Sequence, residues 1–220
     1  MFSLILKDIL ISKKILLLAA AFLIVWVPAF PEEARNFAAV VIMVGMAYMG
    51  LIVTSSADET NKADILLNSL PLRRYEIVLA KYLSIFVYSA IGIAIYLLVA
   101  AATKVLGFPI HVYPINFKAV IYGILAVSFL NGIYLPLMFK FGHGFSGIMY
   151  IILFFGFSYG ISYVIKLFKK LINYDWLQII ISFIMDQSDT VKMLLITAIA
   201  LIILTISYLL SVKFYKNREF

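Results

Sequence analysis

The sequence predicts an all-α integral membrane protein that forms a single domain over residues 1–220. We expect six transmembrane helices, an interfacial helix before the first and a short cytoplasmic helix between the second and third. The first observation is composition: 65% of the residues are hydrophobic and 13% are charged, whereas soluble domains have about 25% charged residues. The second is that the apolar residues gather in six runs without a charged residue or histidine. A bilayer is the solvent that accepts such a surface.

The six runs have the length that a membrane requires. They are Ile15–Pro31, Asn36–Ala57, Tyr82–Thr103, Ala119–Phe139, Gly144–Ile165 and Met193–Val212. All but the first reach about 20 residues, which as a helix spans a hydrocarbon core of about 30 Å. We expect the short first run to borrow Ile9–Ile11 or to thin the bilayer locally. A signal peptide is the alternative for this run, because Lys13 and Lys14 precede it, but no convincing cleavage site follows.

The N-terminal segment Met1–Lys14 predicts a helix that lies on the membrane surface. Ser3, Lys7 and Lys14 fall on roughly one face of a helix, opposite apolar residues. Asp8 interrupts this pattern. The apolar stretch 176–185 is too short to span and precedes the last run, so it predicts an external re-entrant or interfacial helix.

Basic residues in the loops predict that both termini are cytoplasmic, because cytoplasmic loops carry an excess of Lys and Arg. With this orientation eleven basic residues lie inside and seven outside. The three lysines within 166–170 would lie outside, contrary to this excess of basic residues on the inside. The net charge of +7 therefore indicates orientation in the membrane, and we expect no nucleic-acid partner. Without cysteine, the chain has no disulfide and no thiol chemistry.

The loop Ala57–Lys81 is the most informative hydrophilic segment. Thr60 or Asn61 can cap a short helix with Asp64 in its first turn, and Pro71 ends it. This helix carries four apolar residues outside the membrane: Ile65, Leu66, Leu67 and Leu70. Such a surface needs a partner, which is either the ends of the chain's own spans or another protein.

The residues of this loop resemble those of ABC-2 type permeases, in particular the small bacterial exporters of phenol-soluble modulins and lantibiotics. The matching residues are Glu59, Asp64, Leu66, Leu67, Ser69, Leu70, Pro71, Arg74, Ile77, Val78, Lys81 and Tyr82. The order of apolar runs resembles the family along the whole chain. The resemblance implies the bacterial cell membrane and a permease dimer, with the first and fifth spans at the contact.

The resemblance also implies that the short helix is a coupling helix, which docks into a separate ABC ATPase. The residues implied in this contact are Glu59, Lys62, Asp64, Ile65, Leu66, Leu67, Leu70, Pro71, Arg73 and Arg74. Arg73, Arg74 and Glu76 would form its rim. ATP and Mg²⁺ would bind to the partner, because this sequence has no Gly-x-x-x-x-Gly-Lys-Ser/Thr motif.

A few residues within the spans stand out by their chemistry. Gly156 and Gly160 allow close helix packing, either within one subunit or at a dimer contact. Asn131 needs an interhelical hydrogen bond, or it contacts cargo. Tyr159 and Tyr163 line a substrate path or belong to ordinary interfacial aromatic residues.

We therefore predict a non-enzymatic permease subunit that exports amphipathic peptides and uses a partner ATPase. The chain itself is expected to bind no cofactor or metal. A non-transporting membrane scaffold or immunity protein is the alternative, and a passive channel is a third reading. The lack of charged residues and histidines in the runs argues against an intramembrane protease and a proton-coupled carrier.

Overall fold

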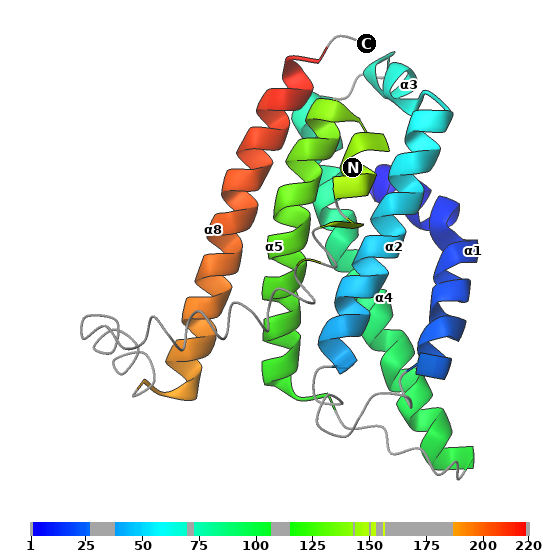
Figure 1. The fold of residues 1–220 in the computed structure, drawn as a ribbon, viewed down its shortest axis with the longest axis vertical. Coiled ribbons are helices and arrows are strands. Elements are labelled where there is room, and N and C mark those ends of the chain that lie inside the picture. Colours follow the sequence, from blue (N-terminus) through cyan, green and yellow to red (C-terminus); the bar gives the residue numbers. More distant parts are fainter. Residues whose placement is uncertain are drawn as a thin grey trace.

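The computed structural model describes residues 2–26, 38–69, 73–106, 115–142, 144–149, 151–152, 156 and 187–218. Within these ranges the chain is helical apart from short connections, and none of their residues lies in a strand. The named helices are α1 (Phe2–Trp26), α2 (Ala38–Thr60), α3 (Ala63–Ser69), α4 (Arg74–Leu106), α5 (Phe117–Phe141) and α8 (Asp189–Lys216) (Figure 1).

The long helices form a bundle with α3 at one end, which we call the α3 end (Figure 1). Helices α1 and α4 start at the α3 end, whereas α2, α5 and α8 finish there. The two most extensively packed helices, α5 and α8, are parallel. Lys118 and Asp189 form an ion pair of 2.7 Å at their first turns, and the rings of Phe139 and Tyr215 meet at 5.2 Å near their last turns.

Four helices of the described part are long and apolar enough to cross a membrane, rather than the predicted six. These are Val40–Thr60, Arg74–Ala102, Phe117–Phe141 and Asp189–Lys216. They contain the fourth and sixth predicted runs and most of the second and third. The fifth run lies largely outside the described residues, and the segment 176–185 lies entirely outside them.

The predicted division between an interfacial helix and a first span is not present, because α1 is one helix from Phe2 to Trp26. In Figure 1 its first turns pass behind α2 before it descends beside that helix. Among its described side chains, Leu4, Asp8 and Ser12 are buried. Asp8, which interrupts the amphipathic pattern in the sequence, pairs with the buried Lys81 and with the partly exposed Lys7.

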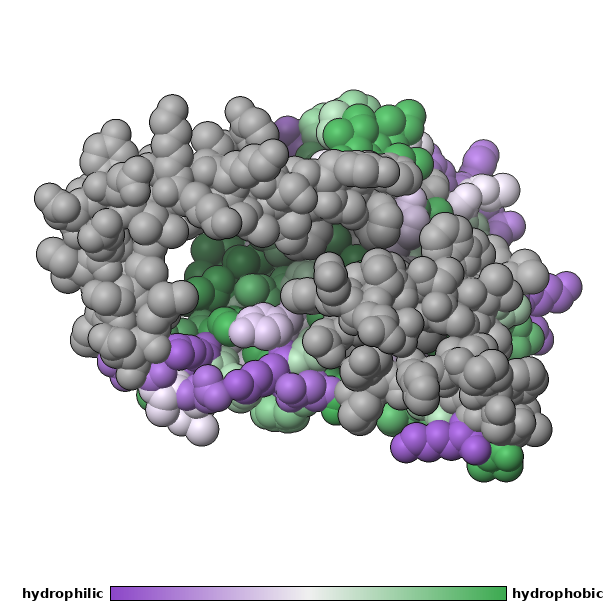
Figure 2. Space-filling model, turned by 60° about the horizontal axis from the view of Figure 1, so that its bottom comes forward, coloured by the Kyte–Doolittle hydropathy of each residue, from purple (hydrophilic) through white to green (hydrophobic). Residues whose placement is uncertain are grey.

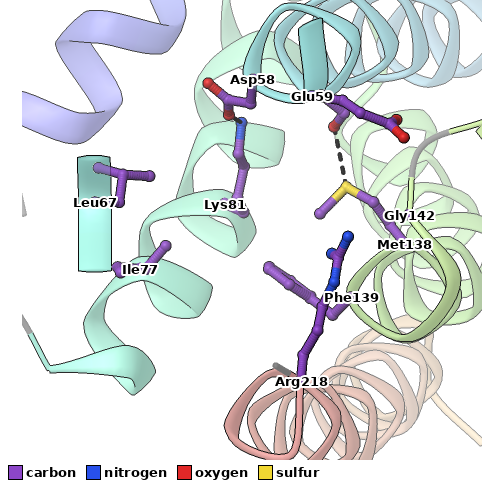
Figure 3. A pocket seen from close by; sticks show the side chains of 10 residues that line it. Asp58, Glu59, Leu67, Ile77, Lys81, Met138, Phe139, Gly142 and Arg218 are labelled. Atoms are coloured by element: carbon purple, nitrogen blue, oxygen red, sulfur yellow. Dashed lines mark hydrogen bonds and ion pairs between the residues drawn. The ribbon is translucent and has the colours of Figure 1, made fainter. Parts of the chain in front are cut away.

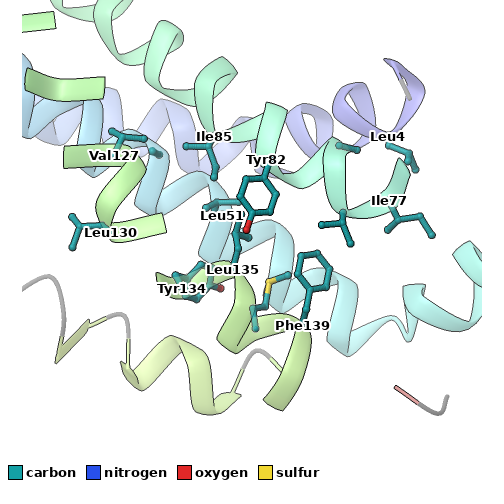
Figure 4. Close-up of a cluster of buried hydrophobic side chains, with 14 of the residues drawn as sticks. Leu4, Leu51, Ile77, Tyr82, Ile85, Val127, Leu130, Tyr134, Leu135 and Phe139 are labelled. Carbon is teal, nitrogen blue, oxygen red and sulfur yellow. The ribbon is translucent and has the colours of Figure 1, made fainter. Parts of the chain in front are cut away.

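The main hydrophobic core lies between α2, α4, α5 and α8, and Leu4 of α1 and Leu67 of α3 join it (Figure 4). Polar contacts cross the same region: the Tyr82 hydroxyl binds the Ser207 and Ser211 hydroxyls, the latter at 2.9 Å. Bilayer-facing helices do not need to bury an apolar surface. Accordingly, most of α8 is exposed, and its buried residues form one stripe against α5.

The backbones of α5 and α8 approach closely at Gly132, where a Cβ atom would lie 2.9 Å from the Ile203 side chain. The Ser207 hydroxyl donates to the Gly132 carbonyl at 2.7 Å in the same place. Seen toward the end opposite α3, the described surface shows polar side chains at its edge and apolar side chains recessed behind them (Figure 2).

Candidate partner-docking site

The connection from α2 to α3 is a turn of two residues, Asn61 and Lys62. The Thr60 hydroxyl donates to the Ser56 carbonyl at 2.9 Å, and the Asn61 side chain donates to the Ala57 carbonyl at 2.8 Å. Lys62 has a φ of 48°, in the left-handed region that reverses the chain after a helix. The expected capping of α3 by Thr60 or Asn61 is therefore wrong. Because the turn is so short, both side chains close the last turn of α2.

Two successive leucines of α3 lie in opposite environments. Leu67 is 9% exposed and belongs to the main core, whereas Leu66 is 66% exposed. Lys62 is also exposed. The side chains of Asp64, Ile65, Leu70 and Pro71 lie outside the described part. Among the described side chains of the short helix, Leu67 thus anchors it to the bundle and Leu66 lies at the surface.

The start of α4 forms the other side of the site. Here Glu76 accepts a hydrogen bond from the Arg73 backbone N–H at 2.9 Å, which satisfies a donor at the helix start. The Arg73 side chain is exposed. Arg74 instead donates from Nη1 to the backbone carbonyls of Lys216, at 2.6 Å, and Tyr215, at 3.4 Å. Of the two predicted rim arginines, only Arg73 lies at an open surface, because Arg74 caps the end of α8.

A pocket opens beneath α3 at the junction of the helices (Figure 3). Its lining residues come from α2, α3, α4, α5 and the segment after α8: Ser55, Asp58, Glu59, Leu67, Ile77, Lys81, Met138, Phe139, Gly142 and Arg218. Gly142 ends α5 with a φ of 86° and donates its N–H to the Met138 carbonyl at 2.9 Å. The predicted contact residue Glu59 is exposed at this pocket. Movement of α3 would therefore disturb several helices at once.

Four charged side chains meet beside this pocket, and we call them the charge cluster: Lys7, Asp8, Asp58 and Lys81. Lys81 Nζ lies 2.7 Å from Asp58 and 3.2 Å from Asp8, and Lys7 Nζ lies 2.7 Å from Asp58. Lys81 and Asp8 are 7% and 2% exposed. Sequence reasoning missed this cluster. The available signal was Asp8 itself, since a carboxylate inside an apolar helix needs a cationic partner.

The remaining predicted residues are distributed over the bundle. Asn131 is fully buried in α5 and donates to the Val127 carbonyl one turn earlier, at 2.8 Å. Gly156 is exposed, and no described side chain lies within 4 Å of the Cβ that it lacks. Gly160, Tyr159 and Tyr163 lie outside the described residues. No three His, Asp or Glu side chains converge as metal ligands in the part of the chain that the structure describes.

The comparison with protein families decides the class of protein. Residues 3–216 match the model of a family described as ABC-2 family transporter protein. The chain belongs to the ABC-2 transporter family. None of the curated proteins and none of the solved structures compared with it matches.

As an ABC-2 transporter protein, the chain is a multi-pass membrane component of a transporter. The resemblance inferred from the loop residues is confirmed at the level of this family. Membership also implies an ABC ATPase as partner. At the α3 end of this ABC-2 protein, the short helix α3 lies outside the candidate spans and has Leu66 exposed.

Proposed function

We propose that the chain is the permease subunit of an ATP-driven exporter and that α3 is the coupling helix on which a separate ATPase acts. The exposed Leu66 is the observation that carries this proposal. It stands on a helix outside the candidate spans, next to a leucine packed in the core. An exposed apolar side chain on a firmly held helix suits a partner's cleft, because burial there removes apolar surface from water.

The proposal gains support from the connections between the α3 end and the rest of the bundle. Leu67 packs in one core cluster with residues of α1, α2, α4, α5 and α8. Arg74 joins the start of α4 to the end of α8. A displacement of α3 would therefore act on helices that are packed against one another. Such packed interfaces switch between discrete arrangements. The energy has to come from nucleotide binding, since a partner with equal affinity for both states shifts neither.

We propose that the α3 end faces the cytoplasm and that the chain crosses the membrane six times. Five basic residues belong to this end: Lys62, Arg73, Lys140, Lys213 and Lys216. Basic residues are enriched on the cytoplasmic side of a membrane protein. Helices α5 and α8 run in the same direction, as an odd number of crossings between them would produce. The four candidate spans, α1 and the fifth apolar run would together make six crossings.

We further propose that two permease copies form the pathway and that the cargo is an amphipathic peptide. Both points rest on the resemblance of the loop to small bacterial peptide exporters. The surface position of Gly156 suits the expected contact of the fifth span with a second copy. Because the sequence lacks a phosphate-binding loop motif, ATP and Mg²⁺ are assigned to the partner ATPase.

The test is purification of the tagged chain from its native cells, with identification of any ABC ATPase that co-purifies. We expect the ATPase to co-purify, and we expect Leu66→Asp to abolish this while the permease remains folded. A single cysteine at the exposed Ser69 should react with a maleimide only after the cells are opened. Reaction in intact cells would refute the orientation. Transport without any ATPase partner, or binding of a target without transport, would favour a channel or a scaffold or immunity protein.

A further inference from the structure

The charge cluster is notable for its balance and for its burial. Two cations face two anions, Lys7 and Lys81 against Asp8 and Asp58. Ser84 adds a hydrogen bond to Asp8 at 3.2 Å. The members come from three helices, with Lys7 and Asp8 on α1, Asp58 on α2 and Lys81 on α4. Every charged atom of the cluster therefore has an oppositely charged atom on another helix.

Such a cluster is a poor device for stability alone. Pairs of apolar side chains hold helices together as well or better, because buried charges lose their hydration. What a buried ion pair does impose is a definite arrangement, since a displaced partner leaves an uncompensated charge. A neighbouring hydrogen bond also joins α1 to α4: the Ser12 hydroxyl donates to the Tyr88 hydroxyl at 3.3 Å. The cluster thus fixes how α1 sits on α2 and α4.

The position of the cluster relates it to α3. Asp58 lies in the last turn of α2, and Lys81 lies in the first turns of α4. These are the two points at which the α3 loop leaves and re-enters the bundle. Both residues line the pocket under α3, together with Leu67 (Figure 3). Asp8 is far away in sequence, yet it pairs with Lys81. The cluster is therefore an electrostatic link between the base of the α3 loop and the N-terminal half of α1.

We propose that Asp8, Asp58 and Lys81 are positioning residues that transmit a displacement of α3 to α1. When the base of the loop moves, the buried charges move together, because separating them leaves a charge without a partner. The first half of α1 therefore follows α3 although no chain segment joins them directly. This inference rests on the proposed function, since it needs a partner that moves α3.

The experiment uses the complex of permease and ATPase in nanodiscs. Since the chain has no cysteine, one reporter cysteine is placed either at exposed Ser69 on α3 or at exposed Leu10 on α1. The rate of maleimide labelling is compared with and without ATP and vanadate. The test variant is the double substitution Asp8→Asn with Lys81→Met. It removes one negative and one positive charge and leaves the Lys7–Asp58 ion pair in place, so we expect the fold to be retained.

In the parent chain we expect nucleotide to change the labelling rate at both reporters. In the double variant the ATPase still co-purifies and the α3 reporter still responds, but the α1 reporter loses its response. Lys81→Arg keeps the charge and the response. Lys118→Gln is the matched control, because it removes an exposed ion pair at the opposite end and leaves both responses intact.

Three results would overturn the inference. One is an α1 response in the double variant equal to that of the parent. Another is an α1 reporter that is silent in the parent while the α3 reporter responds. The third is loss of ATPase binding in the double variant, which would assign the cluster to docking. A parent complex without bound ATPase, or with a silent α3 reporter, would instead refute the proposed function and this inference with it.

Discussion

The contrast between Leu66 and Leu67 gives the sharpest prediction. Full burial of a leucine side chain contributes about 1.5–3 kcal/mol. Leu66 is 66% exposed, so a docked partner can gain at most about 1–2 kcal/mol from covering it. Leu66→Ala should therefore weaken ATPase binding roughly 5- to 30-fold. It should leave the thermal midpoint of the isolated permease almost unchanged.

Leu67→Ala is the matched control, since Leu67 is 9% exposed and packs in the core. Deleting a buried leucine side chain costs about 2–5 kcal/mol, so this variant should lower the thermal midpoint. The assays are titration of nanodisc-embedded permease with purified ATPase and thermal unfolding of the same samples. If Leu66→Ala lowers the midpoint as much as Leu67→Ala does and leaves the dissociation constant unchanged, Leu66 is a packing residue and the reasoning fails.

Three further predictions concern the bundle. Gly50→Ala should destabilise it by about 1–3 kcal/mol, because the new Cβ would overlap the buried Tyr88 ring. Gly45→Ala, with nothing within 4 Å of the new Cβ, should be neutral or stabilising. Equal thermal midpoints for the two variants would contradict this contact. Lys81→Met alone should cost about 3–5 kcal/mol in unfolding experiments, since it leaves an excess buried negative charge; an unchanged midpoint would show that water compensates that charge. Arg74→Ala should speed amide hydrogen exchange in the last turn of α8, because it removes the hydrogen bonds to the carbonyls there. Unchanged exchange together with weaker ATPase binding would instead place Arg74 at the rim of the ATPase contact.

Much of the fold follows from local pattern. The fourth and sixth apolar runs, and most of the second and third, lie in candidate spans, because absence of charge over about 20 residues is a strong requirement of the bilayer. The sequence also predicts that Pro71 ends the short helix at Leu70, but residues 70–72 lie outside the described part. The sequence left open whether the leucines of α3 face the chain's own spans or a partner: Leu67 packs in the core, and Leu66 is exposed.

What could not be predicted depends on contacts between distant residues. Arg74 looks like a free rim charge until the end of α8, 142 residues further on, is folded against it. Thr60 and Asn61 can cap either neighbouring helix, and only the length of the turn decides which. Asp8 disturbs an amphipathic pattern when read alone. Its role becomes visible only when Lys81 is brought within 3.2 Å.

The charge cluster has a consequence for how sequences of this family can diverge. A single replacement at position 8, 58 or 81 leaves a buried charge without its counterpart, whereas a paired replacement does not. Homologous chains should therefore preserve the sum of charges at these three positions and at position 7 more strictly than the identity of any one residue. Where one position becomes neutral in a lineage, a second should have changed with it.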